Sequence, residues 1–206
     1  MSTSNTSKSN SRAQSSKGDQ GPIIGIDLGT IFSCVGIMRN GRVHIVPESN
    51  SGKNTISSTI CFTPTKILKG TAARNNMRQF PESSMFESKR LLGHKYSNPN
   101  VKKDIERWPI KIIEDTKTKK PKYVVKVKDK ISEYFPEEAS SMILEYLKNQ
   151  AEIYNANKEI KKAIITVPAH FNNLQREATI EAANKAGLEV IKLINEPTAL
   201  LLLMEI

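Results

Sequence analysis

One stretch decides the fold: Ile23-Ile24-Gly25-Ile26-Asp27-Leu28-Gly29-Thr30-Ile31-Phe32-Ser33-Cys34-Val35-Gly36-Ile37-Met38. Two runs rich in Ile and Val flank a short turn, and this pattern predicts a β-hairpin. At Gly29 we expect a positive φ and a close approach of a ligand, so that successive amide N–H groups converge on one anion. The turn is therefore a candidate phosphate-binding site, and a plain solvated turn is the alternative.

Asp27 ends the first predicted strand at the mouth of this turn. A carboxylate beside bound phosphate is favourable when it holds a metal ion or the water shell of that ion, because the cation offsets the repulsion between the two anions. Asp27 is therefore a candidate metal-binding residue. The alternative is a carboxylate that only solvates the turn.

The chain has 206 residues and a formal net charge of +10. Its Lys and Arg residues are scattered without interleaved aromatic side chains, which favours a solvated basic surface over nucleic-acid binding. Cys34 and Cys61 both lie in apolar runs and predict small buried side chains in a reducing compartment. Neither the cysteines nor the three histidines show metal-ligand spacing.

Residues 1–21 form a Ser- and Asn-rich tail with almost no apolar side chains, and we expect this tail to be disordered. The tail has neither the apolar centre of a secretory signal nor the Arg-rich face of a transit peptide. The dense apolar run Leu200–Met204 is too short to cross a bilayer. We therefore expect a soluble, cytoplasmic protein that has no membrane partner.

The second half of the sequence predicts an α/β arrangement. A helix begins at Pro136, and its apolar residues recur at helical spacing as far as Ile153. A strand over 162–168, a helix over 174–186 and a strand over 188–194 form a βαβ unit with parallel strands. Ligands gather beyond the carboxyl ends of such strands, so Glu196 is a second candidate carboxylate near Asp27. A charge at a helix N-terminus is the alternative for Glu196.

Shorter elements are expected in the first half. We predict strands over 59–62, 110–113 and 123–127 and helices over 72–77 and 85–93, while the segment 98–107 is polar and is assigned no element. The helix over 85–93 would present Lys89 and Arg90, which by themselves predict a solvated face. The loop at Gly52-Lys53 is not a Walker A motif, since Asn54 stands where Ser or Thr is required.

Five motifs stand in the order found in the heat shock protein 70 family, and the resemblance runs from Pro22 to Ala199. It implies an actin-like ATPase fold of the ribonuclease-H-like class, and this chain matches its first lobe, with a mixed sheet and flanking helices. On this resemblance, residues 22–206 are a truncated nucleotide-binding domain that ends at the start of the helix crossing between the lobes. The motifs are Ile26-Asp27-Leu28-Gly29-Thr30-Ile31-Phe32-Ser33-Cys34, Phe86-Glu87-Ser88-Lys89-Arg90-Leu91-Leu92-Gly93, Tyr134-Phe135-Pro136-Glu137-Glu138, Thr166-Val167-Pro168-Ala169-His170-Phe171-Asn172 and Ile194-Asn195-Glu196-Pro197-Thr198-Ala199.

The resemblance also implies the cofactors, which are ATP or ADP with Mg²⁺, and K⁺ as a possible further ion. Asp27 corresponds to the acid that organises the magnesium water shell and monovalent ions. Gly29, Thr30, Ile31 and Phe32 correspond to the turn that contacts the β- and γ-phosphates.

The resemblance assigns catalytic and relay roles in the same way. Lys89 corresponds to the lysine that positions or polarises the attacking water, and Glu196 to the carboxylate that senses the γ-phosphate and the metal. Pro168 and Arg176 correspond to a proline switch and its arginine relay toward the substrate domain. Transfer of a phosphoryl group to water requires this kind of positioning and charge neutralisation.

Four positions depart from the family pattern. Ile31 replaces a Ser or Thr and loses a hydroxyl at the phosphate site, while His170 stands in place of Tyr. Asn173 replaces Asp, and Lys192 replaces an Arg whose bidentate contacts Lys does not reproduce. These departures weaken the expectation of normal signalling between domains.

The resemblance implies a chaperone-type, ATP-binding protein whose full-length family couples ATP hydrolysis to protein folding in the stress response. The implied partners are nucleotide-exchange factors, J-domain co-chaperones and unfolded clients. Because the sequence contains half of the ATP site, we expect weak nucleotide binding and little or no turnover. The alternative is a non-catalytic fragment that binds co-chaperones, or a truncated product without an independent role.

Overall fold

The computed structural model describes residues 21–196. The expectations for the tail over 1–20, the apolar run Leu200–Met204 and the start of the crossing helix lie outside these residues. Within 21–196, no helix combines the length and the apolar character that a membrane span requires.

The main sheet has the strand order β12-β11-β1-β2-β3, and β4 pairs with β2 beside this path. The predicted hairpin is confirmed, since β1 and β2 pair antiparallel across the turn at 28–31. The predicted βαβ unit is also confirmed, because β11 lies parallel to both β1 and β12 and is joined to β12 by α4. The bounds are β1 Ile23–Asp27, β2 Phe32–Arg39, β3 Arg42–Ile45, β4 Ile56–Ser57, β11 Lys162–Val167, α4 Asn173–Lys185 and β12 Glu189–Asn195.

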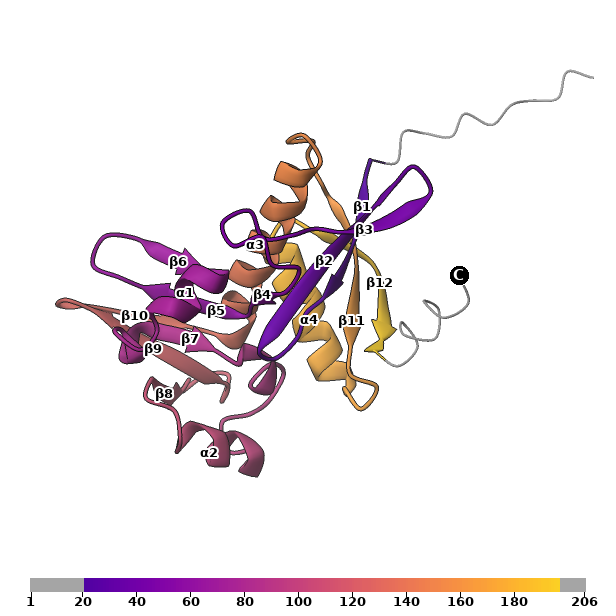
Figure 1. The fold of residues 1–206 in the computed structure, drawn as a ribbon. Coiled ribbons are helices and arrows are strands. Elements are labelled where there is room, and N and C mark those ends of the chain that lie inside the picture. Colours follow the sequence, from indigo (N-terminus) through magenta and orange to yellow (C-terminus); the bar gives the residue numbers. More distant parts are fainter. Residues whose placement is uncertain (1–20, 197–206) are drawn as a thin grey trace, which may run out of the picture.

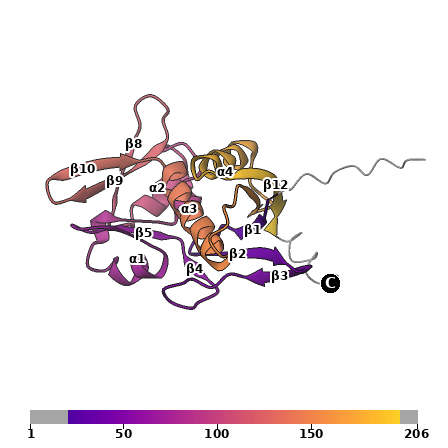
Figure 2. The same cartoon turned by 90° about the horizontal axis from the view of Figure 1, so that it is seen from above.

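Two small antiparallel sheets form the other part of the molecule, with orders β6-β5-β7 and β10-β9-β8. They lie across α3 from the main sheet in both views (Figure 1 and Figure 2). The bounds are β5 Thr59–Phe62, β6 Ile67–Lys69, α1 Gly70–Asn76, η1 Pro81–Ser83, β7 Ser84–Phe86, η2 Ser88–Arg90, α2 Pro99–Ile105, β8 Lys111–Glu114, β9 Pro121–Val127 and β10 Lys130–Tyr134.

The long helix α3, Pro136–Tyr154, holds these parts together, because it contacts strands of all three sheets. Its buried stripe includes Ala139, Ile143 and Leu147, which recur every four residues as the sequence predicted. The stripe ends earlier than expected, since Ile153 is 53% exposed. In β1, side chains alternate between faces, so Ile24 and Ile26 enter the core while Asp27 remains exposed.

The predicted helix over 85–93 is wrong. Met85 and Phe86 lie in β7 and pair with Ile60 and Thr59 of β5. Glu87 then takes a left-handed conformation with φ of 52°, after which only the short 3-10 turn η2 forms. Strand pairing and burial of Met85 therefore override the local helical pattern.

The polar segment 98–107, to which the sequence analysis assigns no element, contains the helix α2. Asn98 caps this helix by accepting a hydrogen bond from the Asn100 amide at 2.9 Å, and Pro99 occupies its first position. Val101 is its one buried side chain, so the helix shows no apolar periodicity. The sequence analysis also missed the strand β10. Both cysteines were expected to be buried; Cys61 is buried, but Cys34 is only half-buried.

Candidate functional site

The turn between β1 and β2 is fixed by two buried serines, Ser33 and Ser58. The Gly29 amide donates to Ser33 Oγ at 3.1 Å, and Ser58 Oγ donates to the Gly29 carbonyl at 2.8 Å. Because the Ser58 proton is used in this way, Ser33 donates in the 2.9 Å bond between the two hydroxyls. The three bonds form a closed ring, and the Ser58 amide adds a bond to the Ile31 carbonyl at 2.9 Å.

Gly29 is required for a different reason from the one we expected. It does not adopt a positive φ. A Cβ at this position would lie 1.9 Å from the Phe32 carbonyl oxygen, so the turn has no room for a side chain there. The Gly29 amide is also engaged by Ser33 rather than directed at a ligand.

The next two amides remain available. Among residues 21–196, no group accepts a hydrogen bond from the Thr30 or Ile31 amide. The Ile31 side chain is 47% exposed and that of Phe32 is 46% exposed, with the Arg74 guanidinium 5.0 Å from the centre of the Phe32 ring. The turn thus offers two backbone donors and a cation on one open surface, which suits an anion.

Asp27 is held at the end of β1 by its neighbours in the sheet. Thr166 of β11 lies beside it in register, and Thr166 Oγ1 donates to Asp27 Oδ1 at 2.7 Å. On the other side, Cys34 of β2 is its antiparallel partner, and burial together with the negative charge of Asp27 raises the pKa of the Cys34 thiol. Asp27 Oδ2 has no hydrogen-bond partner among residues 21–196, so this oxygen is available to bind water or a cation.

Lys89 connects three segments that are far apart in the sequence. Its side chain is 8% exposed, and its Nζ donates to the Leu28 carbonyl at 2.6 Å and to Glu196 Oε1 at 2.7 Å. The ammonium also lies 5.7 Å from the centre of the Phe171 ring. The turn, η2 and the end of β12 therefore meet at one buried cation.

The backbone around η2 directs Lys89 inward. Glu87 turns the chain through its left-handed conformation and pairs with Arg90 at 2.6 Å. Ser88 Oγ lies 3.0 Å from Ser140 Oγ on α3, and this bond attaches the turn to the central helix. The solvated Lys-Arg face that the sequence suggested is wrong for Lys89, which is buried, while Arg90 remains about half exposed.

Arg176 of α4 joins the ends of β11 and β12. Its Nε donates to the Phe171 carbonyl at 3.1 Å, and its Nη2 donates to Asn195 Oδ1 at 2.8 Å. The Phe171 amide in turn donates to the Pro168 carbonyl at 3.1 Å. The two predicted relay residues are therefore linked through Phe171, and Asn195 directly precedes Glu196.

The parallel strands bring the predicted carboxylates to one edge of the sheet, as expected. Asp27 ends β1 and Glu196 follows β12, with β11 lying between these strands. Sequence reasoning missed Ser33, Ser58 and Thr166, since a serine or threonine within a strand pattern carries no signal for a turn contact far along the chain.

No three side chains of His, Cys, Asp or Glu between residues 21 and 196 come together as a metal-binding cluster. Asp27 fits a magnesium ion that is held through water and phosphate oxygens, because its free oxygen supplies one anionic acceptor and the ion obtains the others from a nucleotide. The donor set therefore suits a metal that arrives with its ligand.

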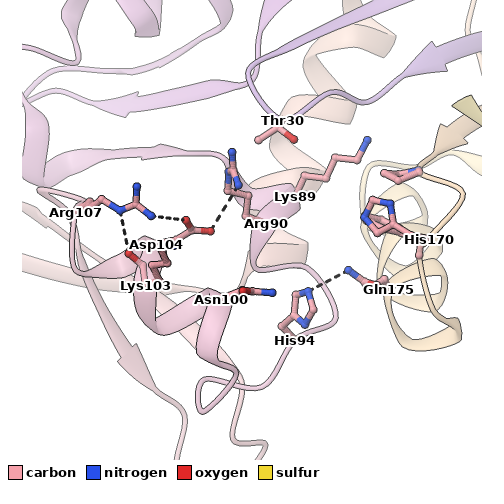
Figure 3. A pocket seen from close by; sticks show the side chains of 12 residues that line it. Thr30, Lys89, Arg90, His94, Asn100, Lys103, Asp104, Arg107, His170 and Gln175 are labelled. Carbon is pink, nitrogen blue, oxygen red and sulfur yellow. Dashed lines mark hydrogen bonds and ion pairs between the residues drawn. The ribbon is translucent and has the colours of Figure 1, made fainter.

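Two cavities border the turn, and Thr30 lines both of them. One has a volume of about 830 Å³ and is lined by Ile31, Ser58 and Arg74 among others. The second has a volume of about 510 Å³ and is lined by Lys89 and His170 among others (Figure 3), with Pro168 also in its wall. Both volumes lie within the range of small-molecule sites.

Comparison with known proteins gives a consistent family match. The family model described as Hsp70 protein matches residues 23–203. Heat shock 70 kDa protein 2 of Paracoccidioides lutzii is 43% identical over 178 residues, which cover 86% of this chain and 27% of that protein. Heat shock 70 kDa protein of Ajellomyces capsulatus is also 43% identical over 178 residues, with coverage of 86% and 25%. The chain thus spans about a quarter of the length of the curated relatives it matches.

Proposed function

The chain belongs to the Hsp70 protein family, and we propose on that premise that it binds Mg²⁺ with ATP or ADP through the turn between β1 and β2. Its fold is part of the actin-like ATPase fold of this family, with a mixed sheet and flanking helices. We propose that residues 22–206 form the first lobe of that nucleotide-binding domain. The longer family members act as ATP-dependent chaperones, and we propose that this chain is a chaperone-type, ATP-binding protein.

The contact set of Lys89 carries the proposal. A nearly buried ammonium that binds the Leu28 carbonyl and the Glu196 carboxylate is fixed beside the turn before any ligand arrives. Such a preorganised charge stabilises phosphoryl transfer without a reorganisation of the site. We propose that Lys89 orients the attacking water and that Glu196 responds to the γ-phosphate and the metal.

The turn supplies the remaining groups. Thr30 and Ile31 offer their amides to the phosphates, and Gly29 and Phe32 shape the backbone between them. Asp27 would hold the magnesium water shell through its free oxygen, and K⁺ could share this position. When bound, Mg²⁺ supplies neutralisation of the phosphate charges. The backbone donor of Ile31 is retained, although its side chain lacks the hydroxyl of the family pattern.

We propose that Pro168 and Arg176 transmit the state of the nucleotide. The support is the chain of contacts from the Pro168 carbonyl through Phe171 to Arg176 and Asn195. A movement of Glu196 would reach Arg176 through its neighbour Asn195. Substitution of Lys for Arg at position 192 does not alter this path, because Lys192 is exposed on β12.

The partners and the location of the chain are also proposals. Family membership supports binding of nucleotide-exchange factors, J-domain co-chaperones and unfolded clients by the longer protein. The free thiols of Cys34 and Cys61 are compatible with the cytoplasm. The second candidate function is a non-catalytic fragment that binds co-chaperones, and the departures at Ile31 and His170 favour it.

Calorimetry of the 206-residue chain with Mg-ATP and Mg-ADP tests the proposal. We expect weak, Mg²⁺-dependent binding and negligible turnover, because the turn is open to water that competes for its donors. Asp27→Asn should abolish the Mg²⁺ dependence, while Lys111→Gln on the exposed surface of β8 should behave as the unchanged chain. Binding without any effect of Asp27→Asn would contradict the proposed site. Micromolar affinity with a turnover that is lost in Lys89→Ala would overturn the expectation of an incomplete enzyme. Absence of binding would favour the interaction fragment.

A further inference from the structure

A third cavity, with a volume of about 310 Å³, lies between the turn that joins β5 to β6 and the hairpin of β9 and β10. Both loops lie at the end of the molecule away from the main sheet (Figure 1 and Figure 2). The volume is at the lower end of the range for small-molecule sites. The cavity therefore suits one or two side chains of a larger ligand better than a whole cofactor.

The floor of this cavity is apolar and aromatic. The ring centres of Phe62 and Tyr134 lie 5.2 Å apart at an interplanar angle of 32°, and Val125, which also lines the cavity, is buried. Ser132 and Thr65 add polar groups to the wall, and their hydroxyls form no hydrogen bond with another group of residues 21–196. An apolar surface with a few free polar groups is typical of a ligand site.

The rim of the cavity is positively charged. Lys66 and Lys130 line it from its two walls, and both are exposed. Within residues 21–196 neither forms an ion pair, whereas Lys122 of β9 pairs with two carboxylates. No acidic side chain of this part of the chain lines the cavity, and Lys128 and Asp129 in the hairpin turn cancel each other. A carboxylate that enters the cavity would thus meet two free ammonium groups.

The strand along one wall has a free edge. β10 ends its sheet in the order β10-β9-β8, so every second residue directs its backbone N–H and C=O away from β9. An extended peptide can pair with such an edge. Lys130, Ser132 and Tyr134 alternate along β10 and all line the cavity. Side chains on the same face of an added strand would therefore reach the cavity.

We propose that this cavity and the edge of β10 bind an acidic, extended segment of a partner protein. An aromatic side chain of the segment packs on the rings of Phe62 and Tyr134. Carboxylates two positions before and after it pair with Lys66 and Lys130, and the backbone adds to β10. The site shares no residue with the turn between β1 and β2, so the proposal does not rest on nucleotide binding.

Two synthetic peptides with blocked ends test the required chemistry. The acidic probe is Ser-Glu-Thr-Phe-Thr-Glu-Ser, and the control has Lys in place of both Glu. Each is labelled with fluorescein and titrated with the 206-residue chain, without nucleotide or Mg²⁺, while anisotropy is measured. We expect saturable binding of the acidic peptide, and binding of the basic peptide that is weaker by about tenfold or more.

NMR with the unlabelled acidic peptide locates the contact. The amide signals of Ile131 and Ser132 on β10 should shift to saturation, while those of Thr30 and Ile31 in the turn between β1 and β2 should stay in place. Failure of nucleotide binding leaves both measurements unaffected.

Charge variants at exposed positions separate this site from a generally basic surface. Lys66→Gln with Lys130→Gln should weaken binding of the acidic peptide by about tenfold. Lys111→Gln with Lys117→Gln removes two exposed cations outside the cavity and should leave binding unchanged. Lys66→Glu with Lys130→Glu should transfer the preference to the basic peptide. Circular dichroism checks that each variant is folded.

Four results would overturn the proposal. They are equal binding of the two peptides, no binding of the acidic peptide, equal weakening by the two Gln pairs, and shifts that spare β10. Sedimentation of the chain alone tests the other occupant of the edge. Self-association that Lys66→Glu with Lys130→Glu abolishes would assign the edge of β10 to a second copy of this chain and would also overturn the proposal.

Discussion

Ser58→Ala should loosen the turn between β1 and β2 and lower the stability of the whole chain. The substitution removes the bond to the Gly29 carbonyl and leaves the hydroxyl proton of Ser33 without its acceptor. Loss of the first bond amounts to about 1 kcal/mol, and an unpartnered buried hydroxyl adds about 1–3 kcal/mol. We therefore expect the free energy of unfolding to fall by about 2–4 kcal/mol.

Urea denaturation followed by circular dichroism measures this change. Ser97→Ala is the matched control, since Ser97 is exposed and should alter stability by less than about 0.5 kcal/mol. Ser33→Ala breaks the same ring. The loss of free energy of unfolding in the variant that carries both Ser33→Ala and Ser58→Ala should therefore be smaller than the sum of the two single losses, by about 1 kcal/mol. Additive effects, or a loss no larger than that of Ser97→Ala, would refute the hydrogen-bonded ring.

Three further predictions concern glycines and a buried acid. Gly29→Ala should distort the turn and abolish nucleotide binding, because its Cβ would lie 1.9 Å from the Phe32 carbonyl; titration with Mg-ADP checks this. Gly70→Ala should destabilise the chain by at least about 1 kcal/mol in thermal unfolding, since Gly70 has a φ of 68° and its Cβ would lie 2.2 Å from Glu48 Oε1. Burial raises the pKa of Glu48, but hydrogen bonds from Ser51, Thr71 and Tyr146 outweigh it and leave the pKa lowered. Because the pKa of Glu48 is lowered in the fold, its carboxylate stabilises the fold at pH values above the unfolded-state pKa near 4.5, and this contribution is lost as the pH falls below that value. Glu48→Gln should therefore flatten the dependence of the free energy of unfolding on pH in that acidic range. An unchanged pH dependence would count against this role of Glu48.

Long elements with strong patterns could be predicted from the sequence. The hairpin of β1 and β2, the helix α3 and the unit β11-α4-β12 all follow from apolar periodicity and their Pro or Gly boundaries. Parallel pairing then placed Asp27 and Glu196 at one edge of the sheet. These predictions succeeded because burial of the same faces decides both the local pattern and the tertiary contact.

The segment around Lys89 could not be predicted in the same way. Met85 to Gly93 has helical spacing, but pairing of β7 with β5 and the left-handed Glu87 decide its path. The inward position of Lys89 depends on acceptors 61 and 107 residues away, the Leu28 carbonyl and the Glu196 carboxylate. A single sequence contains no signal for such pairings, apart from the resemblance to a family.

The turn itself shows a further limit. The sequence predicts a positive φ at Gly29, but the structure excludes a side chain there through crowding against the Phe32 carbonyl instead. The serine ring that holds the turn joins Ser33 in β2 to Ser58, which directly follows β4. Hydroxyl contacts of this kind depend on the final fold and leave no periodic trace in the sequence.

Amide NMR of the turn is the most direct test of the central claim that its backbone binds phosphate. A titration with Mg-ADP should shift the Thr30 and Ile31 amide signals to saturation, while the amide of Ile131, on the distant strand β10, should remain in place. The shifts should disappear in Asp27→Asn. Saturable binding that leaves the Thr30 and Ile31 signals unmoved would contradict the phosphate site and the role assigned to the turn.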